Sequence, residues 1–180
     1  MADSNYTKKE LARAMRELME EQPFEKITIS QICDKGHLNR KSFYYHFRDK
    51  YDLINWIFDM DFIALTQESA DSWKSVEIFC SYLYENRAFY RKVLKIDGQN
   101  SFSEHFHDIV YPLFYDRLKS IIGKDDIPPL CIDFFADGVL CALKRWLLAK
   151  DSMPPDQFVS ILKSILQGTA VAICQNMTLS

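Results

Sequence analysis

Hydrophobic residues return every three to four positions along most of this 180-residue chain, which is the spacing of one face of an α-helix. Polar clusters, glycines and prolines interrupt this pattern at intervals, and only five glycines occur in all. β-branched runs that would suggest strands are rare. The pattern therefore predicts an all-α chain of about nine helices, over residues 7–21, 29–35, 40–47, 50–68, 74–85, 87–95, 101–122, 130–149 and 154–174.

Two of these helices are short and closely spaced. Thr28 is a good N-cap, and Gln31 three residues later completes a capping box for the helix over 29–35. Gly36 then breaks that helix, and Asn39 is the N-cap candidate of the next one. Two short helices joined by a tight turn are the geometry of a DNA-binding helix-turn-helix.

The second short helix has two different faces. Phe43 and Phe47 are four residues apart, so they share a face that should pack on the first helix. The opposite face and its flanks carry basic, hydroxyl and aromatic side chains that suit phosphate and base-edge contacts. The predicted DNA-binding residues are Thr28, Asn39, Arg40, Lys41, Ser42, Tyr44, Tyr45, His46 and Lys50. The simpler alternative is a helical hairpin whose tyrosines cover apolar surface and whose lysines are solvated.

Charge is distributed unevenly along the chain. Residues 1–50 hold ten basic and eight acidic side chains, whereas residues 51–180 hold twelve and seventeen, and the whole chain carries −3. Within 35–50 there are five basic residues and one acid. The overall charge would not indicate a nucleic-acid-binding protein, but the local excess of positive charge does.

The helix over 7–21 should complete the helix-turn-helix. Thr7 and Glu10 form a candidate capping box at its start, and Pro23 follows its end. Its apolar residues lie on one side, so it is expected to form the third wall of a three-helix DNA-binding domain.

Residues 6–60 resemble the N-terminal domain of TetR-type transcriptional regulators. The motifs that carry the resemblance are TISQI at 28–32, RKSFYYHF at 40–47 and KYDL at 50–53. The resemblance implies that Thr28 and Tyr45 touch the DNA backbone, that 40–42 approach bases, and that Lys50 holds a phosphate. It also implies that the helix over 50–68 is a lever that transmits ligand binding to the DNA-reading helices.

One position departs from the family pattern. The family usually has glycine where this chain has His37, and Gly36 stands one place earlier. Such a turn often requires a left-handed residue, which histidine tolerates better than most non-glycines. The departure leaves open a second hypothesis, an effector-binding or protein-interaction co-regulator with a weakened DNA-reading surface.

The last two predicted helices are apolar around most of their circumference, so each should be buried on more than one side. In so small a chain the second side is expected to be another subunit, and two helices from each copy would form a four-helix interface. A monomer that buries both helices in its own core is the alternative. The family resemblance independently implies the dimer.

The middle of the chain, from about 79 to 115, is rich in aromatic residues, and in TetR-like regulators this region encloses a small-molecule pocket. The effector-binding candidates are Tyr82, Tyr90, Phe102, Phe106 and His107. Taken singly, each is more often an ordinary core residue. Residues 90–106 also show a looser resemblance to the subgroup of the dihydroxyacetone kinase operon activator, which does not identify the effector.

Other function classes find little support. No signal peptide, membrane span or CxxC pair occurs, so a cytoplasmic protein with reduced, buried cysteines and no membrane partner is expected. His105 and His107 are two apart on a helix and diverge, so they do not suit a shared metal. No nucleophile–base set or phosphate-binding glycine loop is found. The sequence therefore predicts neither an enzyme nor a cofactor.

Together these features predict a three-helix helix-turn-helix domain at 1–50 joined to a helical ligand-binding and dimerisation domain at 51–180, with the helix over 50–68 connecting them. The expected function is ligand-responsive transcriptional regulation, as a repressor rather than an activator. The homodimer would bind a near-palindromic operator in double-stranded DNA, with dimer contacts through 130–149 and 154–174. Its small-molecule effector is not identified by the sequence.

Overall fold

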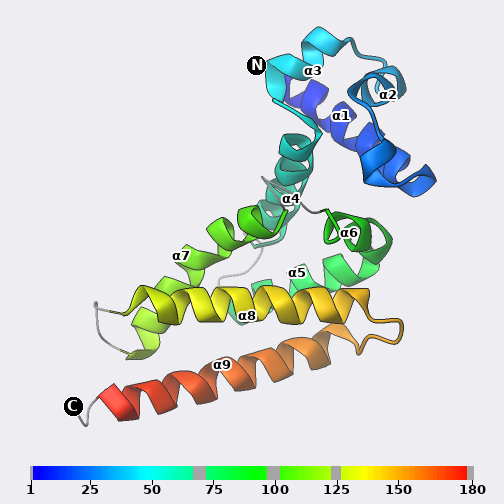
Figure 1. Cartoon of the computed structure of the whole chain (residues 1–180). Coiled ribbons are helices and arrows are strands. Elements are labelled where there is room, and N and C mark those ends of the chain that lie inside the picture. The colour runs from blue at the N-terminus through cyan, green and yellow to red at the C-terminus, as the bar shows by residue number, and fades with distance from the viewer. Residues whose placement is uncertain (1, 67–71, 97–101, 123–126, 178–180) are drawn as a thin grey trace. The chain divides into compact units, whose positions relative to one another are not determined.

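The computed structural model of the chain describes residues 2–66, 72–96, 102–122 and 127–177. Within these ranges the secondary structure is helical throughout, which confirms the predicted all-α fold with nine α-helices (Figure 1). A single-turn 3-10 helix, η1, precedes the second of them. The elements are α1 (Ala2–Glu21), η1 (Phe24–Lys26), α2 (Ile29–Lys35), α3 (Arg40–His46), α4 (Lys50–Thr66), α5 (Ser72–Glu85), α6 (Arg87–Val93), α7 (Phe102–Ile122), α8 (Pro129–Leu148) and α9 (Pro155–Met177).

Most predicted helix ends lie within a few residues of the observed ones, but α1 begins five residues before Thr7. Residues 2–6 contain no proline or glycine, so nothing in them opposes extension of the helix. The predicted capping box at Thr7 is therefore wrong. The connections between the predicted helices over 50–68 and 74–85, and between those over 87–95 and 101–122, fall mostly outside the described residues.

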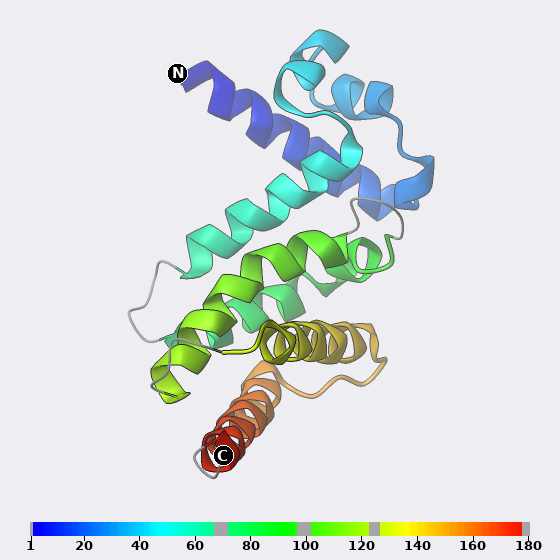
Figure 2. The same cartoon turned by 60° about the vertical axis from the view of Figure 1, so that its left-hand side comes forward.

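Contacts divide the chain into two compact units, and the first comprises Met1–Glu68 together with Asn86–Phe102. In this unit α1 packs against α2, α3, α4 and α6 (Figures 1 and 2). Its inward face is fully buried at Leu11, Ala14 and Met15. Since α4 and α6 also belong here, this division differs from the predicted functional boundary at residue 50.

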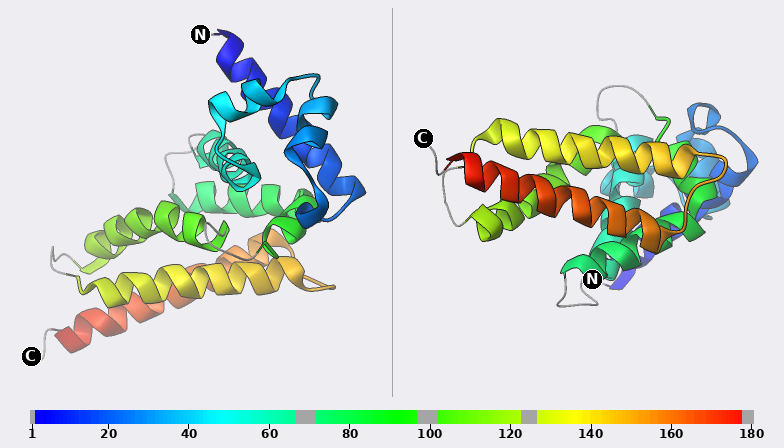
Figure 3. Two further views of the ribbon diagram at one scale, coloured as in Figure 1. Left: turned by 45° about the horizontal axis from the view of Figure 1, so that its top comes forward. Right: turned by 90° about the horizontal axis from the view of Figure 1, so that it is seen from below.

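The second unit comprises Ser69–Glu85 and Ser103–Ser180. Helices α8 and α9 run antiparallel and side by side, and α9 also packs on α5 (Figure 3). An aromatic stack joins three of its helices. The Trp146 ring lies parallel to Phe158 at 4.4 Å and against Tyr84 at 5.6 Å, and its indole N–H donates to the Met153 carbonyl at 2.8 Å.

The four cysteines whose side chains are described are free thiols in different environments. Cys33 and Cys80 are buried and Cys131 is half-buried, but Cys141 is exposed on α8. The prediction that every thiol is buried is therefore wrong for Cys141. Burial raises the pKa of the Cys80 thiol to about 12.

None of the helices that the structure describes is long and apolar enough to cross a lipid bilayer.

Candidate nucleic-acid interface

The predicted capping box at the start of α2 is present. The Gln31 backbone N–H donates to the Thr28 hydroxyl at 3.2 Å, and the Thr28 backbone N–H donates to the Gln31 side-chain carbonyl at 2.9 Å. Each of these two hydrogen bonds thus satisfies a backbone N–H that would otherwise have no partner at the start of the helix. Thr28 itself is exposed, so the same residue that fixes the start of α2 also stands at the surface.

The turn after α2 is a Schellman motif with histidine in the left-handed position. The Leu38 N–H donates to the Cys33 carbonyl at 2.9 Å, and the His37 N–H donates to the Asp34 carbonyl at 3.2 Å. His37 has φ of 53°, which no other non-glycine residue in the described part of the chain matches in sign. The left-handed residue expected at this turn is therefore His37 itself.

Gly36 does not supply the left-handed residue of this turn. Its φ of −86° is open to any residue. A Cβ at this position would lie 3.3 Å from the Ile32 carbonyl oxygen and 3.6 Å from that of Glu10 on α1. The distance to α1 is an ordinary van der Waals contact, so the tight contact of such a Cβ would lie within α2, while His37 supplies the left-handed residue of the turn.

Helix α3 is oriented by its cap and its apolar face. The Asn39 side-chain oxygen accepts from the Ser42 backbone N–H at 2.8 Å and from the Ser42 hydroxyl at 3.2 Å. Phe43 and Phe47 are buried, as the sequence predicted. This arrangement turns the opposite side of α3 to solvent.

The outward side carries the predicted reading residues. Tyr45 is 81% exposed and Tyr44 is 50% exposed, and Arg40 and Lys41 are exposed as well. The Arg40 guanidinium lies 6.0 Å from the Tyr44 ring centre, and its pKa is raised chiefly by a hydrogen bond with that tyrosine. Exposed aromatic rings beside two cations are a costly arrangement in water and a suitable one against a DNA groove.

His46 is half-buried at the end of α3, with its ring edge-on to Tyr45 at 4.8 Å. Burial lowers the pKa of His46, and the nearby positive charge of Lys8 lowers it further. The imidazole is therefore neutral at pH 7 in the free protein. Lys8 lies over the rings of Phe47 and Trp56, at 5.8 and 5.7 Å.

The side chain of Lys50, which is predicted to hold a phosphate, is hydrogen-bonded within the protein. Its ammonium donates to the backbone carbonyls of Phe24, Ile27 and Glu25, at 2.8, 2.9 and 3.2 Å. It also lies 4.4 Å from the Phe24 ring centre. Burial lowers the pKa of Lys50, although the charge of Glu25 partly opposes the shift.

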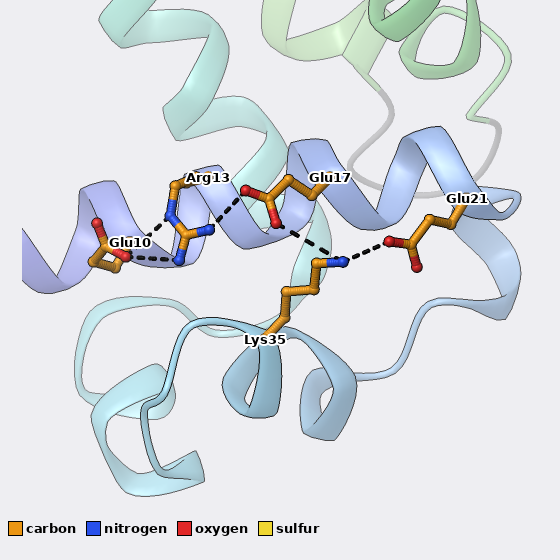
Figure 4. A network of polar contacts seen from close by, with 5 residues as sticks. All are labelled: Glu10, Arg13, Glu17, Glu21 and Lys35. Atoms are coloured by element: carbon orange, nitrogen blue, oxygen red, sulfur yellow. Dashed lines mark hydrogen bonds and ion pairs between the residues drawn. The ribbon is translucent and has the colours of Figure 1, made fainter.

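An ion-pair network joins α2 to α1 (Figure 4). Lys35 pairs with Glu21 at 2.5 Å and with Glu17 at 3.8 Å, and Arg13 pairs with Glu17 at 2.6 Å and with Glu10 at 2.9 Å. All five side chains are at least partly exposed, so each pair contributes little by itself. The network joins the end of α2 to α1 and uses Lys35 within the protein, so the five basic residues over 35–50 are not all available to DNA.

Helix α6 is bound into the first unit by polar contacts that the sequence did not reveal. The Tyr90 hydroxyl on α6 donates to Asp61 on α4, and the same carboxylate oxygen accepts from Arg16 on α1 at 2.5 Å. The Lys92 ammonium donates to the carbonyls of Met19 and Glu20 at the end of α1. These partners lie 29 to 73 residues apart in the chain, so no local motif marks them.

The five effector-binding candidates are divided between the two units. Tyr90 and Phe102 belong to the first unit, where Tyr90 holds Asp61 and Phe102 packs edge-on against Phe58 at 4.9 Å. The other three, Tyr82, Phe106 and His107, belong to the second unit. Phe106 is buried, whereas Tyr82 and His107 are half-buried.

His107 lies beside a carboxylate of the neighbouring helix α8. Its Nε2 lies 3.6 Å from an Asp133 carboxylate oxygen on α8, and its ring lies 5.5 Å from that of Tyr111. Among the residues whose positions are described, no group of three or more His, Cys, Asp or Glu side chains is placed to hold a metal ion.

Two family models match the chain. Residues 11–57 match the model of bacterial regulatory proteins of the tetR family, and residues 71–168 match a transcriptional regulator C-terminal region. The first match covers α2, α3 and the turn between them, and the second covers α5 to most of α9.

Individual relatives agree with these models. The chain is 30% identical over 154 residues to the HTH-type dhaKLM operon transcriptional activator DhaS of Lactococcus lactis subsp. lactis (strain IL1403), covering 81% of each protein. A solved structure of the dihydroxyacetone kinase operon activator DhaS has a TM-score of 0.62 at 22% identity, over 92% of this chain and 97% of that one. A TetR transcriptional regulator from Streptococcus agalactiae 2603V has a TM-score of 0.69 at 20% identity, over 92% and 96%.

Proposed function

Because this chain belongs to the TetR family of bacterial transcriptional regulators, we propose that it binds operator DNA as a homodimer and responds to a small-molecule effector. Two α3 helices would enter successive major grooves, roughly 34–36 Å apart, on a near-palindromic site.

The observation that carries this proposal is the outward face of α3. Arg40, Lys41, Tyr44 and Tyr45 are all exposed on a helix whose other side is buried at Phe43. A helix held in this way presents its side chains to a groove without rearranging. In the proposed complex, Arg40, Lys41 and Ser42 read base edges, and Thr28 and Tyr45 contact the DNA backbone.

Exposed apolar side chains on α8 and α9 support the homodimer. Leu130 and Phe134 on α8 are 78% and 69% exposed, and Ile161 and Ile165 on α9 are 50% and 57% exposed. Their spacing of four residues places each pair on one face of its helix. We propose that these faces meet their copies in a second subunit and form a four-helix interface.

The division of the chain supports a route for effector response. Helix α6 belongs to the first unit, while α5 before it and α7 after it belong to the second. We propose that an effector bound among residues of the second unit, near Tyr82, Phe106 and His107, moves α6 through these chain connections. Since Tyr90 and Lys92 tie α6 to α4 and α1, such a movement would reach the DNA-binding helices.

Fluorescence anisotropy with labelled DNA from the region upstream of the gene tests the proposal. The expected result is salt-dependent, saturable binding that exceeds binding to unrelated DNA of equal length. The Lys41→Ala, Tyr45→Ala double variant should lose most of the specific component. Absence of specific binding by the wild-type protein, or equal binding by the double variant, would contradict the proposal.

The co-regulator hypothesis rested on the displaced turn glycine, and the left-handed His37 removes that support. A purified sample that fails to bind the upstream DNA alone, and binds it when a partner protein is added, would restore it. The direction of regulation is a separate question, because the sequence favours a repressor while the Lactococcus relative is named an activator. A reporter gene placed behind the operator measures the direction. Deletion of the regulator gene should raise reporter expression if the protein is a repressor and lower it if the protein is an activator.

A further inference from the structure

A side chain of α4 holds the segment that joins α1 to α2. η1 spans Phe24–Lys26, and Thr28, the N-cap of α2, follows two residues later. The first residue of α4, Lys50, points its ammonium at three backbone carbonyls of this segment, 23 to 26 residues earlier in the chain.

These contacts use all three N–H donors of the Lys50 ammonium group. A lysine has three N–H donors, and the carbonyls of Phe24, Glu25 and Ile27 accept at 2.8, 3.2 and 2.9 Å. The Phe24 ring lies 4.4 Å from the same nitrogen, and Tyr51 packs edge-on against that ring at 5.0 Å. A phosphate contact by Lys50 would have to break at least one of these hydrogen bonds.

We propose that Lys50 is a positioning residue for DNA binding, which holds the segment over 24–27 and thereby places Thr28 and α2, and that it makes no phosphate contact. The inference rests on the proposed DNA binding. It gives the lysine of the KYDL motif a role different from the phosphate contact that the family resemblance implies.

The salt dependence of DNA binding separates the two roles. Each lysine that neutralises a phosphate releases about one counterion, so the loss of Lys50 from both subunits of the proposed homodimer would reduce the magnitude of the slope of log K against log salt by about 1.8. Lys50→Met should weaken binding and leave the slope unchanged. Lys41→Met is the matched control, because it removes an exposed cation that is proposed to lie in the DNA groove, and it should reduce the magnitude of the slope. A decrease of about 1.8 in the magnitude of the slope for Lys50→Met would overturn the proposal.

A conservative variant provides a second, independent test. Arginine serves well against a phosphate, but its planar fork does not match three convergent carbonyls. Lys50→Arg should therefore lose affinity about as strongly as Lys50→Met. Wild-type affinity in Lys50→Arg would overturn the proposal, and this comparison with the wild-type protein does not depend on whether Lys50→Met folds, which circular dichroism measures.

A double-mutant cycle shows whether Lys50 acts through α2. Thr28→Ala and Lys50→Met should have non-additive effects on DNA affinity, since both disturb the same helix start. Additive effects would mean that Lys50 acts independently of the start of α2 and would overturn the positioning role. Failure of the proposed function is distinguishable, because the wild-type protein would then show no specific binding before any variant is compared.

Discussion

The Tyr90 hydroxyl on α6 donates a hydrogen bond to the Asp61 carboxylate on α4. Tyr90 is 1% exposed, and the carboxylate oxygen that it reaches also accepts from Arg16 on α1. Three helices of the first unit therefore meet at one oxygen atom. The Arg16 guanidinium lies 4.4 Å from the ring centre of Phe89, which gives α6 a second contact at the same place.

Removal of the Tyr90 hydroxyl should destabilise this unit. Tyr90→Phe deletes a hydrogen bond to a charged acceptor, so the free energy of unfolding should fall by about 1.5–3 kcal/mol in urea denaturation. Tyr6→Phe, at a tyrosine that is 62% exposed on α1, is the control and should change stability little. Equal effects of the two substitutions would mean that the Tyr90 hydroxyl contributes nothing to the fold.

The left-handed conformation of His37 predicts opposite effects of two substitutions. Its φ of 53° costs a non-glycine residue about 1–2 kcal/mol. Glycine avoids this steric cost, but it loses more conformational entropy on folding, so its net gain is smaller. His37→Gly should therefore raise the free energy of unfolding by up to about 1 kcal/mol, and His37→Val should lower it by about 1–2 kcal/mol. Thermal and urea unfolding measure both, and identical stabilities for the two variants would contradict the observed turn.

The lowered pKa of His46 predicts a loss of stability in mild acid. The unfolded chain binds the proton more tightly than the folded protein does. The stability that the neutral His46 contributes is therefore fully present above the ordinary histidine pKa, and it is lost as pH falls through the lower pKa of the folded state. Between about pH 7.5 and about pH 5, the wild-type protein should lose more stability than His46→Gln. A wild-type protein that gains stability relative to the variant over this range would contradict the burial of His46.

The exposed faces of α8 and α9 predict a substitution that separates the subunits. Phe134→Glu places a charge at an apolar position that the proposed dimer buries, so sedimentation velocity should show a monomer. The helices of each subunit should remain folded, because Phe134 is 69% exposed within one chain. Tyr6→Glu is the matched control and should leave the association unchanged. A dimer that survives Phe134→Glu would place the interface elsewhere.

Thiol labelling supplies a second measurement of the same interface. Cys141 is exposed on α8, whereas Cys80 is buried with a pKa raised to about 12. Peptide mapping after brief alkylation at about pH 8 should find Cys80 unmodified. Cys141 should react more slowly in the wild-type protein than in Phe134→Glu. Equal rates at Cys141 would argue against burial of this part of α8 in the dimer.

Much of the candidate interface could be predicted because its determinants are local. Thr28 and Gln31, and Asn39 and Ser42, are three residues apart, so capping rules recognise the starts of both helices. The period of 3.6 residues separates Phe43 and Phe47 from the outward side of α3. The error at the start of α1 has a local cause as well, because Thr7 forms a good capping pattern within a segment that has no reason to stop being helical.

The sequence by itself determined the all-α fold, the caps of α2 and α3 and the outward face of α3, since each depends on residues within one or two helical turns. Only the tertiary structure decided what Lys50 binds and which carboxylate Tyr90 reaches. These outcomes depend on backbone carbonyls and side chains brought together from distant parts of the chain. The sequence shows a lysine but not whether its three N–H donors bind phosphates or carbonyls. In the folded chain the ammonium of Lys50 binds three backbone carbonyls.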